Sequence, residues 1–426
     1  MSFPPSSNVP SRSNVPPNGT APLPGWSEVV VVPGWDDDVA AGASDEARRV
    51  QKLLGPPVGP LAGASWWRLD LSPDDRGALG MWAAAHLALF ALAWAAAWVY
   101  RTTPSHAPLT GVFEHWDAAL LRNIAQYGYF SSHSTANNTV FLPGYPMMLA
   151  TVHLILRSWV LSELIISGVS GCFAVVSLSR LAGGRRAVLY LLTMPAAIFL
   201  TVGYTECLFL AFAIPAWHAA TRGRWWRAAL LAGLSGLVRP DAVFLIPALT
   251  VMALTGPRGH RLFNALKTYY ALVGPAAYEI YLTARTGHWD AWAKAQQAGW
   301  DLHVVSPVQA FKTTWWAAFE HPFSAAYAFE FQLEFAAMAA TVLATLAFLW
   351  RHRWPEAVYC GLAALALGTQ TWYQAVPRTL LVLFPVYVAL AGLETRRPWV
   401  RTAYLSVCAP LAAVVGLLFL AYQWAG

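Results

Sequence analysis

The residues best suited to chemistry are a few charged side chains that interrupt otherwise apolar sequence. Three are carboxylates, Asp117, Glu206 and Asp241, and two are arginines, Arg239 and Arg378. A carboxylate can accept the proton of an attacking hydroxyl, and a guanidinium can hold a phosphate through two parallel hydrogen bonds. Ionisable groups at membrane depth are costly and usually face an interior or a cavity. The five side chains therefore predict one site, if the fold brings them to one face; the alternative is that they are scattered interfacial residues.

Asp117 lies in a polar, aromatic-rich segment at 114–146, EHWDAALLRNIAQYGYFSSHSTANNTVFLPGYP. Glu114 is the nearest alternative base, and His115 could tune either carboxylate. Trp116 either packs against the membrane, which we favour, or stacks on a ring of a ligand. Arg122 follows on an expected helix, close enough to pair with a carboxylate or to reach a phosphate. The competing interpretation of Asp117 is a solvated loop acid.

The other motifs also allow two interpretations each. Glu206, with Tyr204 in the string GYTE, either caps the next helix or binds a ligand hydroxyl. Arg239 and Asp241 separate two short apolar runs, which predicts a broken helix beside a wet cavity. There they bind a phosphate and a hydroxyl of a ligand, or pair only with each other. Arg378 either holds a phosphate or anchors a helix at the membrane interface.

Composition identifies the class of protein that carries these motifs. The 426 residues are 57% hydrophobic and only 12% charged, which predicts an all-α polytopic membrane protein. The net charge of +6 comes from short arginine clusters between apolar segments, so we expect no nucleic-acid partner. The four cysteines lie far apart, without metal-site spacing. We therefore predict no disulfide and no metal site. The first residues lack an apolar h-region, so we also expect no signal peptide.

The arginine clusters also predict the topology, because short cytoplasmic loops are rich in Lys and Arg. Residues 1–75 form a largely disordered cytoplasmic tail, and residues 76–426 form a transmembrane domain that begins with a span at 77–100. About eleven crossings, among them 159–181 and 187–205, place every arginine cluster inside. The large extracytoplasmic loops are then 101–158, which includes a helix at 143–157 along the bilayer surface, and 283–332. The stretch 228–254 is split into two short crossings.

Four motifs in this order resemble one family. They are HWDAALLRNIAQYGY followed by FLPGYP, then VGYTECLFL, GLSGLVRPDAVFLIP and AVPRTLLVLFPVYVAL. Together they are similar to the second GPI mannosyltransferase, the PIG-V family of GT-C glycosyltransferases. The resemblance covers roughly residues 111–390. The tail and the last helix lie outside it, and the second large loop shows no matching motif.

The resemblance implies a GT-C fold and an inverting mannosyltransferase in the plasma membrane, with its site on the extracytoplasmic face. The donor is polyprenyl-phosphate mannose, the acceptor a hydroxyl of a lipid-linked or surface glycan, and no cofactor or divalent metal is needed. Asp117 is the catalytic base. The substrate-binding residues are Glu114, His115, Trp116, Arg122, Tyr204, Glu206, Arg239, Asp241 and Arg378.

Other interpretations remain open at this stage. With only four lysines, the composition is more typical of a bacterial relative, so a eukaryotic GPI acceptor is not implied. A GT-C enzyme that uses another polyprenyl-phosphate sugar fits the same motifs. A lipid-linked sugar transporter or flippase would also need a broken helix and buried charges, although it should show repeated halves. A catalytically silent scaffold would use Asp117 only structurally.

Overall fold

The computed structural model describes residues 70–99, 113, 115–257, 260–320 and 323–423, which belong to the compact unit Leu69–Gly426. Within these ranges the chain forms helices and no β-strand, with one isolated bridge between Val304 and Gln370. Glu114 and most of the predicted tail lie outside the described residues. The α-helices are α2 (Pro73–Val99), α3 (Asp117–Tyr127), α4 (Gly144–Leu156), α5 (Trp159–Ala182), α6 (Arg186–Leu192), α7 (Glu206–Thr221), α8 (Trp225–Gly236), α9 (Ala242–Thr255), α10 (Arg261–Thr268), α11 (Val273–Thr286), α12 (Ala291–Trp300), α13 (Pro307–Trp315), α14 (Ala325–Trp350), α15 (Trp354–Gly368), α16 (Val376–Val382), α17 (Pro385–Arg396) and α18 (Trp399–Leu420). Shorter turns are the 3₁₀ segments η2 (Ala136–Val140), η3 (Pro195–Leu200) and η4 (Tyr269–Leu272) and the π-helical η5 (Trp316–Glu320).

Four of the described helices, α2, α5, α14 and α18, are long and apolar enough to cross a membrane. Helices α16 and α17 form a fifth candidate that is bent by 68°. The apolar helices α4, α7 and α9 are shorter. This confirms an all-α membrane protein, whereas the count of about eleven crossings stays a prediction.

Several elements match the segments expected from sequence, and others differ. Helix α5 coincides with the crossing expected after residue 158. It begins there because the Ser158 side chain caps the helix by accepting a hydrogen bond from the Leu161 N–H. The helix ends at Ala182, and Gly183 follows as its C-cap with a left-handed φ of +68°. In place of one crossing at 187–205 the chain forms α6 and η3. Helix α14 begins at Ala325, inside the loop predicted at 283–332.

The expected break between 228 and 254 is confirmed. Helix α8 ends at Gly236, and α9 begins at Ala242. The connecting residues include Arg239, Pro240 and Asp241. Proline lacks an N–H donor and disfavours a helical residue before it, which accounts for the end of α8 just ahead of this turn.

One end of the helices gathers several arginines. Arg180, at the end of α5, forms an ion pair of 2.9 Å with Asp75 in the first turn of α2. Arg186 and Arg401 both lie 3.7 Å from Glu394, near the end of α17. The α2 start, the α5–α6 turn and the α17–α18 turn therefore meet, as the arginine pattern predicts for a shared side.

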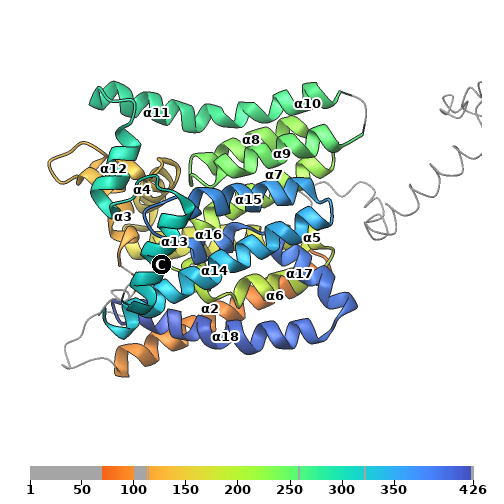
Figure 1. Ribbon diagram of the computed structural model, residues 1–426. Coiled ribbons are helices and arrows are strands. Elements are labelled where there is room, and N and C mark those ends of the chain that lie inside the picture. The colour runs from red at the N-terminus through yellow and green to blue at the C-terminus, as the bar shows by residue number, and fades with distance from the viewer. Residues whose placement is uncertain (1–69, 100–112, 114, 258–259, 321–322, 424–426) are drawn as a thin grey trace, which may run out of the picture. The chain divides into compact units, whose positions relative to one another are not determined.

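At another part of the fold, loop segments pack together as short helices. The Trp292 indole on α12 donates to the Val140 carbonyl of η2 at 3.1 Å, and the Tyr278 hydroxyl donates to the Thr139 carbonyl at 2.9 Å. Burial raises the pKa of Tyr129, so its hydroxyl stays protonated and donates to the Phe141 carbonyl at 2.9 Å. The first two bonds join the segment before α4 to α12 and α11, and α11 lies end to end with α10 in Figure 1.

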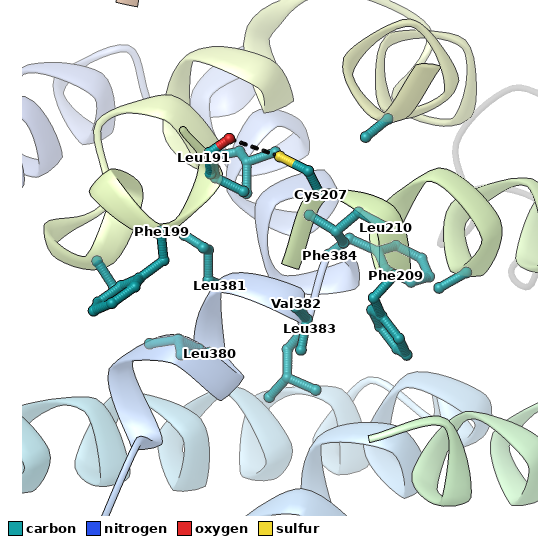
Figure 2. Packing of buried hydrophobic residues seen from close by; sticks show 14 of the residues in the cluster. Leu191, Phe199, Cys207, Phe209, Leu210, Leu380, Leu381, Val382, Leu383 and Phe384 are labelled. Carbon is teal, nitrogen blue, oxygen red and sulfur yellow. Dashed lines mark hydrogen bonds between the residues drawn. The ribbon is translucent and has the colours of Figure 1, made fainter. Parts of the chain in front are cut away.

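The core is continuous from α2 to α18, which lie in contact. Its centre is the bent pair α16–α17: Figure 2 shows Leu380, Leu381, Val382, Leu383 and Phe384 packed near Phe199 and Phe209. The Cys207 thiol donates to the Leu200 carbonyl at 2.9 Å, so this cysteine serves packing. The four cysteines are free, and the described residues form no group of three or more His, Cys, Asp or Glu that could hold a metal ion.

Candidate active site

Arg378 is the central residue of the predicted site. On α16, its Nη1 donates to Asp117 Oδ2 at 2.8 Å, and its Nε donates to Glu206 Oε1 at 2.8 Å. Asp117 is the first residue of α3 and Glu206 the first residue of α7. One guanidinium thus joins two carboxylates from helix starts that are distant in sequence. The expectation that these charges converge is confirmed for all three residues.

Arg239 extends the network into the broken segment between α8 and α9. Its Nη1 donates to Glu206 Oε1 at 2.7 Å and to Thr205 Oγ1 at 3.1 Å, while its Nε donates to Asp241 Oδ2 at 2.8 Å. Arg239 and Asp241 therefore do not pair only with each other. Glu206 is fully buried and bonds both arginines, and the structure shows no side-chain cap at the start of α7.

Two aromatic rings contact the Arg378 guanidinium. Its Cζ lies 4.7 Å from the Tyr204 ring centroid and 4.9 Å from that of Phe199. A planar guanidinium stacks well on such rings, and its edge stays available for hydrogen bonds. Tyr204, predicted as a site residue, thus contacts Arg378 and is itself buried.

The charged network lies on the wall of a cavity of about 530 Å³. Its charged lining residues are Asp117, Arg239, Asp241 and Arg378. The wall continues with indoles and amides, which are Trp116, Trp292, Trp300, Asn137, Gln296, Gln370 and Gln374. Such a surface suits a ligand with a charged group at one end and hydroxyls at the other, because indole faces pack on sugar rings and amides bond hydroxyls.

The remaining predicted residues are placed differently. Trp116 lines the cavity with a left-handed φ of +54° and packs 5.9 Å from the Tyr422 ring. His115 is buried against Phe419 and Tyr422, behind the cavity wall. Arg122 forms a bidentate pair with Glu163, in which its Nε donates to Oε1 at 3.0 Å and its Nη2 to Oε2 at 3.1 Å, and it does not line the cavity. Glu114 lies outside the described residues.

Sequence reasoning missed part of the lining. It assigned no contact to Trp300 within the second large loop predicted at 283–332, and it did not single out Gln296, Gln370 or Gln374. The string GTQTWYQAVPR holds two glutamines directly after an apolar run, which is the signal that could have indicated them. In the structure, Thr371 positions the loop that carries Gln370 and Gln374. Its hydroxyl donates to the Asp301 carbonyl at 2.9 Å, which holds the loop against the end of α12.

Comparison with known proteins bears directly on the predicted resemblance. No protein-family model matches the chain. A stretch of the chain is 31% identical over 154 residues to GPI alpha-1,6-mannosyltransferase 2 of Homo sapiens, covering 32% of this chain and 30% of that protein. Over this stretch the chain is PIG-V-like.

The same similarity extends to other mammals. The proteins of that name from Rattus norvegicus and Cricetulus griseus are 30% and 29% identical to the PIG-V-like stretch, over 154 and 153 residues. The chain spans about 30% of the length of each of these curated relatives. The predicted resemblance is confirmed for this portion.

Proposed function

We propose that this chain is an inverting membrane mannosyltransferase. It moves mannose from a polyprenyl-phosphate donor to a hydroxyl of a glycolipid or glycan acceptor, on the extracytoplasmic face of the plasma membrane. The observation that carries the proposal is the contact between Asp117 and Arg378 on a cavity wall. A candidate base and a candidate phosphate ligand lie side by side there. The mannosyltransferase names of the partial relatives support the same chemistry.

The donor phosphate binds at the arginine end of the cavity. Transfer breaks the bond between the sugar C1 and the phosphate oxygen, and the electron pair of that bond stays on the phosphate. Arg378 and Arg239 stabilise this developing charge with preorganised N–H donors. Glu206 holds both guanidiniums in place, since its Oε1 accepts from each of them.

The acceptor hydroxyl attacks C1 from the face opposite the phosphate, and its proton passes to Asp117. Asp117 Oδ2 accepts from Arg378, and within the described residues no hydrogen bond occupies its Oδ1. A phosphate that takes over Nη1 of Arg378 frees the carboxylate further. The product keeps one new bond from C1 to the acceptor oxygen, with the configuration at C1 inverted.

The acceptor glycan takes the indole and amide part of the cavity. Trp292 and Trp300 come from α12, and Gln370 and Gln374 from the loop before α16. The Trp292 indole N–H is already bonded to a carbonyl, so this side chain offers its ring. These residues lie on the same cavity as Asp117, so an acceptor bound there reaches the base.

The test is a transfer assay with the full chain in lipid nanodiscs, radiolabelled polyprenyl-phosphate mannose and a panel of glycolipid acceptors. We expect a mannosylated product that an α-mannosidase cleaves. If the protein transferred a different sugar from a polyprenyl-phosphate donor and transferred no mannose, the choice of donor would be overturned. The proposed donor carries mannose in a β linkage, so a β-linked product would overturn inversion.

Asp117→Asn tests the base. We expect kcat to fall by about 100- to 10,000-fold, the range of general base catalysis, with donor binding retained. The matched control is Glu356→Gln, since Glu356 pairs with Arg353 on α15 and does not line the cavity. Wild-type turnover in a folded Asp117→Asn variant would show that the base lies elsewhere.

Arg378→Ala tests the phosphate ligand. We expect donor binding to weaken strongly and kcat to fall by about 100- to 1,000-fold, because a preorganised donor to the leaving group is lost. Direct binding of a non-transferable donor analogue separates this effect from that of Asp117→Asn. Equal donor affinity in both variants would refute the division of roles.

We also propose that turnover needs no divalent cation. Two guanidiniums already present N–H donors where the phosphate binds, and each of the three nearby carboxylates accepts from at least one of them. Turnover should therefore be unchanged in excess EDTA. An EDTA-sensitive rate that Mg²⁺ or Mn²⁺ restores would overturn this part.

A further inference from the structure

Helix α14 contributes a buried carboxylate that lies beside the site without lining its cavity. Glu334 is 1% exposed, and both of its oxygens accept backbone hydrogen bonds. Oε1 accepts from the Ala375 N–H at 2.9 Å and Oε2 from the Val376 N–H at 2.8 Å. A carboxylate withdrawn from water is stable only when such donors satisfy it, so both bonds matter for this side chain.

The turn that Glu334 holds is unusual. Ala375 has a φ of +57°, the left-handed region that a non-glycine residue adopts at a cost of about 1–2 kcal/mol. Strained residues of this kind persist only where surrounding contacts fix them. Arg378 is in the first turn of the helix that follows, so the direction of its guanidinium depends on how this turn is held.

We propose that Glu334 is a positioning residue for Arg378: its two backbone hydrogen bonds fix the Ala375–Val376 turn and thereby aim the guanidinium at the cavity. The role of Arg378 as phosphate ligand rests on the proposed function, whereas the positioning of the turn does not. Glu334 acts through backbone atoms and touches no reacting group.

The same helix supplies a matched control. Glu330 lies one turn earlier on α14, is 2% exposed, and within the described residues makes no hydrogen bond to the α16 turn. Its Oε1 is buried and has no hydrogen-bond partner there. Replacing Glu330 thus removes a buried carboxylate from the same helix and leaves the turn intact.

The experiment compares Glu334→Gln with Glu330→Gln in the full chain in nanodiscs, using hydrogen–deuterium exchange and transfer kinetics. A glutamine has one acceptor oxygen, so one of the two N–H groups would face an NH₂ donor. We expect exchange in the peptide that covers residues 375–383 to rise by about 10- to 100-fold in Glu334→Gln. Glu330→Gln should leave it unchanged.

The kinetics test whether the effect reaches Arg378. We expect the KM for the donor to rise about tenfold or more in Glu334→Gln. In an Arg378→Ala background the same change should raise KM no further, since coupled residues are non-additive. A merely structural role would lower the melting temperature without this dependence on Arg378.

Each result decides the proposal. Unchanged exchange at 375–383, or an equal rise in both variants, overturns the positioning role. An additive effect of Glu334→Gln in the Arg378→Ala background overturns the link to Arg378. If wild-type protein transfers no mannose, the proposed function fails, and the exchange measurement still decides whether Glu334 holds the turn.

Discussion

Glu206 is the residue on which both arginines of the site depend. It is fully buried, and one of its oxygens accepts from Arg239 at 2.7 Å and from Arg378 at 2.8 Å. Removal of one partner of a buried ion pair leaves uncompensated charge, which costs about 3–5 kcal/mol. Glu206→Ala should therefore lower the free energy of unfolding by this amount, measured by reversible denaturation in mixed micelles, and abolish transfer.

The control for this prediction is an exposed pair. Asp290 lies 3.0 Å from Lys294 on the surface of α12, where solvent screens the interaction. Asp290→Ala should leave the free energy of unfolding nearly unchanged. If Glu206→Ala were no more destabilising than Asp290→Ala, the buried network would not hold the site together.

At the scale of elements, interruptions in helices position the site. The start of α4 docks on the break between α8 and α9: the Gly144 N–H donates to the Leu237 carbonyl at 2.7 Å. A Cβ on Gly144 would lie 2.7 Å from that same oxygen, so Gly144→Ala must displace the turn that carries Arg239. We expect a loss of about 1–3 kcal/mol in stability and reduced transfer.

A second glycine gives the comparison for this element. A Cβ on Gly168, inside α5, would meet no atom within 4 Å. Gly168→Ala should be neutral or stabilising, because alanine favours a helix over glycine by about 1 kcal/mol. Melting temperatures and transfer rates of both variants check the prediction, and equal effects would show that the Gly144 contact does not constrain the site.

At the scale of the whole molecule, arginine pairs lie where α2 begins, whereas the candidate site lies where α3, α7 and α16 begin. The arginine-rich end should face the cytoplasm, since positive loops stay inside. Trp289→Cys, at an exposed position before α12, should then react with a membrane-impermeant maleimide in intact cells. Thr395→Cys, exposed near the end of α17, should react only after permeabilisation. The reverse pattern would invert the topology.

The sequence by itself determined the membrane class, the helix break at Arg239 and the identities of the charged site residues. These follow from local properties: apolar length, proline at 240 and the high cost of burying charge. It also indicated a resemblance that the PIG-V-like stretch confirms. Arg122 shows where local reasoning ends, because Glu163, its partner on α5, is distant in sequence.

Only the tertiary structure decided which charges pair and what lines the cavity. Arg378 meets Asp117 and Glu206 because three helix starts converge, and no spacing in the sequence encodes that convergence. Likewise, Glu334 has no motif, since its partners are backbone N–H groups that become available only when α14 packs on α16. Residue type is a property of the chain, whereas a hydrogen bond between distant residues is a property of the packed fold, where burial makes each unpaired group costly.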